Sequence, residues 1–174
     1  MHATITEFLV ILKTYFLNII TKNNYKFDLP KPFVDPGGFG TIRKYDIHTG
    51  IDLYCQDGDS VFAIEDGVVI AIEDFTGESA GSPWWEQTQA VVIKSGDLIW
   101  LYGEITTDLI VGQKMSEGQI IGKVKRVLKK DKQKTPTSML HIELYNNYNG
   151  SVIWEHNKLQ PYGLLDPTNK LLEL

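Results

Sequence analysis

Two segments of the chain carry residue types that bind metal ions. One is HTGID at 48–52, and the other is MLHIEL at 139–144. Two imidazoles and one carboxylate form a ligand set that zinc accepts while a coordination position stays open for water. His48, Asp52 and His141 are therefore candidate zinc ligands. Spacing alone leaves open the alternative that both histidines are ordinary surface or core residues.

The sequence around these residues indicates how they could converge. Gly50, followed by the strand-forming residues after Asp52, favours a bend that runs into a strand, so His48 and Asp52 can point toward one place. In 139–144 apolar residues occupy every second position, which places His141 and the other alternate residues on the face opposite the core.

The elements that must position these segments are short strands. From residue 25 onward, short apolar runs alternate with Gly, Asp and Asn, and no helical periodicity is visible. Eight strands without intervening helices predict a mainly β fold, an antiparallel sandwich or open barrel. We expect these strands at 51–55, 60–65, 67–73, 89–94, 97–102, 119–125, 139–145 and 151–154.

Residues 1–24 differ from the rest of the chain. Apolar residues recur there at three- and four-residue steps, which predicts an amphipathic helix ahead of a domain at 25–174. Glu7 and Lys13 interrupt the apolar stretch, so it fits neither a signal peptide nor a membrane span. We expect this helix to pack on its own domain or a partner's, or to lie on a membrane surface.

Composition excludes several other classes of protein. The 174 residues carry a formal net charge of -5, which argues against a nucleic-acid-binding protein because phosphate contacts need a basic surface. The single cysteine, Cys55, excludes an internal disulfide framework and a multi-cysteine zinc site. Any metal site must therefore draw on carboxylates and the four histidines.

Further short motifs occur in an order that resembles a known family. They are GFG at 38–40, HTGID at 48–52, GDSVFA at 58–63, DGVV at 66–69, VGQ at 111–113, EGQIIG at 117–122, LHIE at 140–143 and LDP at 165–167. The stretch 38–167, about three quarters of the chain, resembles the lysostaphin-type (LytM-like) zinc endopeptidases, which cut peptide cross-links in bacterial cell walls.

The resemblance carries several expectations. It implies a LytM-like fold of the duplicated hybrid motif type and one zinc ion held by His48, Asp52 and His141. It also implies a peptide or peptidoglycan-derived substrate and action in the cell envelope or after export, although residues 1–24 show no route of export.

Two departures from the family pattern concern proton transfer. The family carries two histidines that flank the metal-bound water, one in a Tyr-x-His-Leu strand and one two residues before the last ligand. Glu104 and Met139 stand at those positions. Met139 can neither transfer a proton nor donate a hydrogen bond. Glu104 could act as general base if it reaches the water.

The sequence thus predicts a zinc-dependent peptidase in which zinc activates a water molecule and Glu104 is the base. One alternative is a zinc-holding module without catalysis that recognises a cell-wall peptide or a protein partner. Another is a metal-free structural domain.

Five further residues are candidates for supporting roles. Glu143 could accept the N–H of a ligand imidazole or be a solvent-exposed carboxylate. Arg43 could hold a substrate carboxylate or carbonyl, or form a structural ion pair. Trp84 and Trp85, in the long loop 76–88, could form a stacking surface over a groove or cap the core. Tyr102 is a further candidate for contact with a ligand or the substrate.

Overall fold

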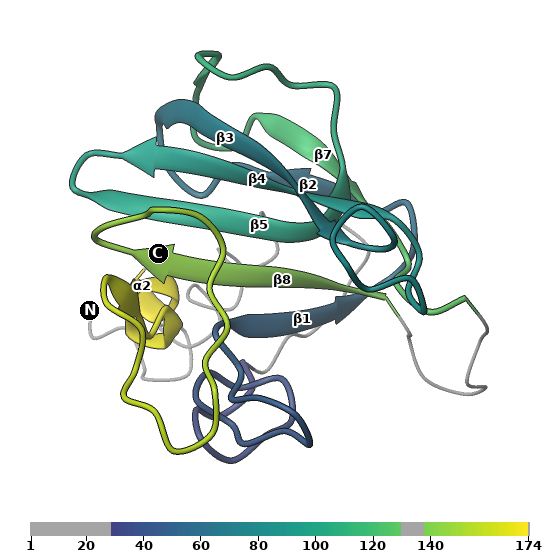
Figure 1. Ribbon diagram of the computed structural model, residues 1–174. Helices are drawn as coiled ribbons and strands as arrows, with labels where there is room; N and C mark the ends of the chain where they lie inside the picture. Colours follow the sequence, from purple (N-terminus) through teal and green to yellow (C-terminus); the bar gives the residue numbers. More distant parts are fainter. Residues whose placement is uncertain (1–28, 130–137, 174) are drawn as a thin grey trace, which may run out of the picture.

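The computed structural model describes residues 29–129 and 138–173 (Figure 1). Within these ranges the chain is mainly β, as expected. The strands are β1 (Ile51–Cys55), β2 (Ser60–Phe62), β3 (Gly67–Thr76), β4 (Thr88–Ser95), β5 (Leu98–Thr106), β6 (Lys114–Met115), β7 (Ile120–Val124), β8 (Ser138–Tyr145) and β9 (Leu164–Leu165), and one helix, α2 (Thr168–Glu173), follows them. The predicted helix at 1–24 lies outside the described residues.

All the strand pairs are antiparallel and belong to one open sheet. Its main order is β1-β8-β5-β4-β3-β6, with β2 and β7 joined to β5 through β7, and β9 beside β8 (Figure 1). Strands β4 and β5 lie in the middle of the sheet. Their apolar runs, 90–93 and 98–102, put apolar side chains on both faces. Trp100, Leu101 and Tyr102 of β5 are each at most 1% exposed and form the centre of the core.

Seven of the eight expected strands are present near their expected positions, but the strand at 151–154 is wrong. Only Trp154 in that stretch pairs, through an isolated bridge to Ile47. Val152 and Ile153 have suitable β-branched side chains, but neither pairs with any of the described strands. β6, β9 and α2 were not expected, because elements of two to six residues are too short to show periodicity.

The expected long loop at 76–88 contacts the segment that follows β7. An isolated bridge joins Trp85, between β3 and β4, to Leu128, after β7, and the Lys129 ammonium donates a hydrogen bond to the Pro83 carbonyl at 2.7 Å. These contacts attach the loop that carries both tryptophans to the body of the sheet.

Strand β5 contains a β-bulge that changes its direction beside β8. Up to Gly103 the strand pairs with β8, and from Ile105 it pairs with β7. Opposite β4, the register shifts so that one extra residue is accommodated between Tyr102 and Ile105. Glu104 lies at this point with a φ of 61°, in the left-handed region that non-glycine residues seldom adopt. Bulges of this kind re-aim a side chain.

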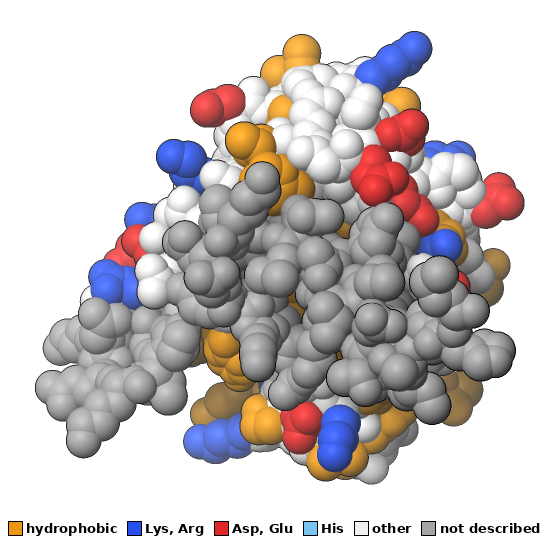
Figure 2. Space-filling view, turned by 180° about the vertical axis from the view of Figure 1, so that it is seen from behind, with side chains coloured by type: hydrophobic (Ala, Val, Ile, Leu, Met, Phe, Trp, Pro, Cys, Tyr) orange, Lys and Arg blue, Asp and Glu red, His pale blue; other side chains and the backbone are white. Residues whose placement is uncertain are grey.

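Two further observations concern the charges on the surface and the length of the helices. Figure 2 shows acidic and basic side chains interspersed among the described residues that are visible on one face. In the described part of the chain, no helix has the length and apolar character needed to cross a membrane.

Candidate metal centre

The three predicted ligands converge at the edge of the sheet. His48 precedes β1, Asp52 lies within β1, and His141 lies directly opposite Asp52 on β8. Gly50 makes this approach possible, because a Cβ at this position would lie 2.3 Å from the Ile142 carbonyl oxygen and 2.9 Å from the His141 ring. The glycine of the HTGID segment is therefore a steric requirement of the site.

The donor atoms form a small triangle of the size that a metal ion needs. His48 Nε2 lies 3.0 Å from Asp52 Oδ1 and 3.2 Å from His141 Nδ1, and His141 Nδ1 lies 2.8 Å from Asp52 Oδ1. Tetrahedral zinc, with bonds near 2.0–2.1 Å, separates its ligand atoms by roughly 3.3 Å. All three residues are buried, and they form the group within the described residues that could hold a metal ion.

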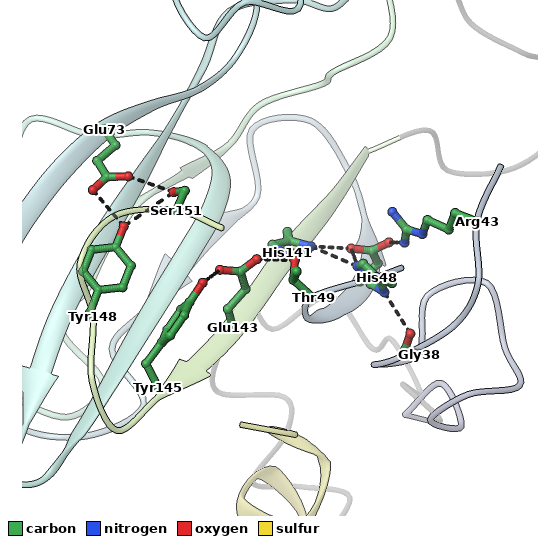
Figure 3. Close-up of polar contacts among 11 residues, drawn as sticks. Gly38, Arg43, His48, Thr49, Glu73, His141, Glu143, Tyr145, Tyr148 and Ser151 are labelled. Carbon is green, nitrogen blue, oxygen red and sulfur yellow. Dashed lines mark hydrogen bonds and ion pairs between the residues drawn. The ribbon is translucent and has the colours of Figure 1, made fainter. Parts of the chain in front are cut away.

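Each ligand is oriented through its other polar atom (Figure 3). His48 Nδ1 donates to the Gly38 carbonyl at 2.9 Å, which leaves Nε2 free to bind a cation. His141 Nε2 lies 3.0 Å from Glu143 Oε1 and donates to it, which directs Nδ1 inward. Arg43 pairs with Asp52 Oδ2, so Oδ1 remains for the centre. Such partners fix the tautomer and orientation of metal-binding histidines.

Glu143 is itself held by two hydroxyl groups. Thr49 donates to its Oε1 and Tyr145 donates to its Oε2, in addition to the contact with His141 (Figure 3). The carboxylate is 2% exposed. Burial alone would raise its pKa, but the hydrogen bond and charge of His141 and the two hydroxyls lower it. Glu143 is thus a buried, ionised partner of a ligand imidazole rather than a solvent-exposed side chain.

The centre favours positive charge. Burial alone would raise the pKa of the Asp52 carboxyl, but hydrogen bonds from His141 and His48 hold it well below its ordinary value. Burial lowers the pKa of His141, whereas Asp52 and Glu143 raise it more strongly, to about 10. In His48 burial prevails and lowers the pKa. A proton on His141 therefore occupies, in the metal-free protein, the place where a cation would bind.

Glu104 lies beside this centre without a hydrogen-bond partner. Its Oε2 atom is buried and unpaired within the described structure. Burial raises the pKa of its carboxyl to about 8, with a further increase from the Asp52 charge and opposing effects of His141 and Arg43. The neighbouring Gly103 pairs with His141 across the strands. The bulge thus keeps a carboxyl group next to the ligands with nothing else to bind.

The other predicted residues lie in different surroundings. Tyr102 is 1% exposed, and its hydroxyl accepts a hydrogen bond from the Ile64 amide at 3.0 Å, so it sits in the core. Trp84 is 64% exposed, and Trp85 is half-buried. A contact of any of these three with substrate stays a prediction. Arg43 bonds to Asp52 and to the Pro36 carbonyl, and the other proposed role, contact with substrate, stays a prediction too.

Sequence reasoning missed three contributors to the centre. The Gly38 carbonyl could not be found, because a backbone oxygen carries no sequence signal. Thr49 lies inside the HTGID segment but is not a ligand type. Tyr145 had a usable signal, since strand alternation places it on the same face as His141 and Glu143.

The comparisons with known proteins fall into two groups. The model of a protein family described as "Peptidase family M23" matches residues 46–153. A comparison with curated protein sequences gave no match.

Among solved structures, the chain resembles CbpA from L. salivarius REN, with 22% identity and a TM-score of 0.52, covering 83% of this chain and 84% of that one. It also resembles the catalytic domain of the antimicrobial peptidase lysostaphin from Staphylococcus simulans, with 22% identity and a TM-score of 0.50, covering 86% of this chain and 93% of that one. At these identities the likeness supports the fold alone.

Proposed function

Because the chain belongs to peptidase family M23, we propose that it hydrolyses a peptide bond with one zinc ion held by His48, Asp52 and His141 and with Glu104 as general base. The family makes it a metallopeptidase-like protein; the metal, the base and the substrate are the proposal. The observation that carries it is the triangle of three buried donor atoms, 2.8–3.2 Å apart, beside an unpaired carboxyl group.

The donor set fits zinc in type as well as spacing. Two imidazole nitrogens and one carboxylate oxygen are ligands that zinc accepts in catalytic sites, and three protein ligands leave a position open. Gly38, Glu143 and Arg43 hold the second atom of each ligand, so the centre is arranged before an ion binds. A zinc ion bound there supplies a Lewis acid that lowers the pKa of water and polarises a carbonyl.

Glu104 would take the proton of the attacking water. A general base works best when its pKa lies near the operating pH, and the pKa of Glu104 is raised to about 8. A cation at the ligands would lower this value and favour the carboxylate. The carboxyl is not committed to another group within the described structure, so it is free to bind water or substrate.

For the substrate, we propose a peptide cross-link of peptidoglycan, on the basis of the family membership and the order of the motifs. Action in the cell envelope or outside the cell follows from that substrate. The proposed contacts of Trp84 and Trp85 with a peptide or sugar belong to the same hypothesis.

One observation favours a second candidate, a zinc-holding module that binds a wall peptide or a protein partner without cleaving it. His156, the remaining histidine in the described part of the chain, contacts the Arg43 and Asp46 carbonyls at 2.9 Å and is committed there. Proton transfer at the centre would therefore depend on a carboxyl group instead of an imidazole.

Metal analysis and a paired assay test the proposal. Purified protein is expected to hold one equivalent of zinc and to cleave peptidoglycan or a glycine-rich peptide. Glu104→Gln should keep the zinc and lose turnover by about 10²–10⁴-fold, the usual contribution of a general base. Glu117→Gln, an exposed carboxylate in the turn between β6 and β7, is the matched control and should behave as wild type.

The outcomes separate the candidates. Equal turnover of wild type and Glu104→Gln would remove Glu104 from the mechanism. Stoichiometric zinc with peptide binding but no cleavage would favour the non-catalytic module. Protein without zinc or a similar divalent ion, even after incubation with it, would contradict both.

A further inference from the structure

In the proposed reaction a zinc ion would polarise the scissile carbonyl, but neither Glu104 nor Met139 gives its oxygen a hydrogen bond. Negative charge develops on the carbonyl oxygen as water attacks, and hydrogen-bond donors aimed at that oxygen lower the barrier. The proposed base, Glu104, accepts a proton and is not a fixed donor. Met139 has no donor at all.

Most donors that contact the predicted ligands are already committed. Thr49 and Tyr145 both donate their hydroxyl hydrogen to Glu143. The Arg43 guanidinium pairs with Asp52 and bonds to the Pro36 carbonyl through the same nitrogen, Nη2. The amide of Asp52 donates to the Gly37 carbonyl. The hydroxyls of Thr49 and Tyr145 and the Asp52 amide are therefore taken, whereas the Nε and Nη1 groups of Arg43 keep their hydrogens.

Tyr54 differs from these groups in its position and its freedom. It lies on β1 two residues after Asp52, so both side chains project from the same face of the strand. Its cross-strand partner on β8 is Met139, just as His141 is the partner of Asp52. On this face of the sheet, the Tyr54–Met139 pair therefore lies next to the Asp52–His141 pair.

The length of the tyrosine side chain suits this place. Residues two apart on a strand are separated by about 6.6–6.8 Å, a distance that a tyrosine leaning along the strand can span with its hydroxyl. Burial raises the pKa of this hydroxyl, and the charges of Asp52, Arg43 and Glu104 also act on it. The residue is 44% exposed, so its hydroxyl is accessible to a substrate.

We propose that the Tyr54 hydroxyl donates a hydrogen bond to the oxygen of the scissile carbonyl and stabilises the charge that develops there. The inference rests on the proposed function and adds a catalytic residue to it. A phenol is a neutral donor at physiological pH. Because it lies opposite Met139, Tyr54 supplies a donor at a position where the paired residue of β8 has none.

The test compares wild type, Tyr54→Phe and the control Tyr162→Phe, all loaded with zinc. Tyr162 is 84% exposed and precedes β9, which pairs with the end of β8 beyond His141. On a glycine-rich peptide, Tyr54→Phe should lower kcat by roughly 10²-fold, the lower end of the effect of one lost oxyanion donor, with KM changed less than about twofold. Tyr162→Phe should match wild type.

A second measurement probes the same contact without turnover. A phosphinate analogue of the peptide carries charged oxygens where the carbonyl oxygen would be, so Tyr54→Phe should bind it more weakly than wild type while holding the same amount of zinc. Equal kcat in Tyr54→Phe and wild type, or a change in KM alone, would overturn the inference while leaving the proposed function intact. Wild type that cleaves nothing would overturn the proposed function and this inference with it.

Discussion

The two sides of the candidate metal centre are built in opposite ways. On the ligand side, formed by His48, Asp52, His141 and their partners, the second polar atom of each ligand is bonded to another group. On the unpaired side, formed by Tyr54, Glu104 and Met139, the Glu104 Oε2 atom has no hydrogen-bond partner within the described residues, and Tyr54 is partly exposed to solvent.

The two sides therefore differ in their effect on the free energy of unfolding: the ligand side contributes hydrogen bonds, and the unpaired side carries destabilising features. A left-handed φ at a non-glycine residue costs on the order of 1–3 kcal/mol, and an unsatisfied buried polar group costs about 1–3 kcal/mol. Glu104 carries both features. The ligand side is arranged to hold an ion in one geometry, whereas the unpaired side keeps polar groups available for something that is not part of the chain.

The largest expected effect is the loss of a ligand. His141→Ala should weaken zinc binding by more than about 10²-fold, because the 10–16 kcal/mol typical of zinc bound by four ligands averages roughly 3 kcal/mol for each. Titration with a competing chelator measures the change. His156→Ala, which removes an exposed histidine bound only to backbone carbonyls, is the control. Unchanged zinc affinity in His141→Ala would contradict the assignment of His141 as a ligand.

The next effect concerns the groups that are hydrogen-bonded to the ligands and their contribution to zinc affinity. Glu143→Gln keeps the shape of the side chain but removes the charge that His141 faces, so zinc affinity should fall by about 10–100-fold. The same chelator titration reports it. Affinity equal to that of wild type would mean that the ligand side does not depend on this carboxylate.

The unpaired side predicts a gain in stability. Glu104→Gly should raise the free energy of unfolding of the metal-free protein by about 1 kcal/mol, because glycine adopts positive φ without strain and the buried carboxyl is removed, while greater chain entropy in the unfolded state offsets part of the gain. Urea unfolding measures it. Glu104→Gln retains the strained backbone and should gain less. Activity should be lost in both variants.

The smallest effect concerns one of the hydroxyls on Glu143. Tyr145→Phe leaves the contacts of Glu143 with Thr49 and His141 in place, so zinc affinity should fall less than about tenfold, below the loss for Glu143→Gln. Comparing both variants with their double mutant shows whether Tyr145 acts through Glu143. Fully additive losses would contradict that pathway.

Sequence reasoning reached the ligand side more completely than the unpaired side. Alternation in 139–144 placed His141 and Glu143 on one face, and the motif order supplied the partner segment, so His48, Asp52 and His141 converge as expected. The expected carboxylate beside the histidine, Glu143, does contact its ring. These features depend on residue type and local spacing, which a sequence displays directly.

The unpaired side depends on features that spacing does not reveal. The bulge at Glu104 arises because β5 changes partner from β8 to β7, a property of the whole sheet. The pairing of Tyr54 with Met139 required the register between β1 and β8. The strand expected at 151–154 failed for the same kind of reason, since β-forming residues need a neighbouring strand that the local sequence does not specify.

The position of β1 at the edge of the sheet has a consequence for motion. Within the described residues its ladder partner is β8 alone, and the loop at Gly37 meets its other edge through one hydrogen bond of 2.9 Å. Edge strands open locally at lower free energy than central ones. An ion bound by Asp52 of β1 and His141 of β8 would cross-link the two strands. Amide hydrogen exchange in β1 should therefore slow when zinc binds, while exchange in β4 stays the same.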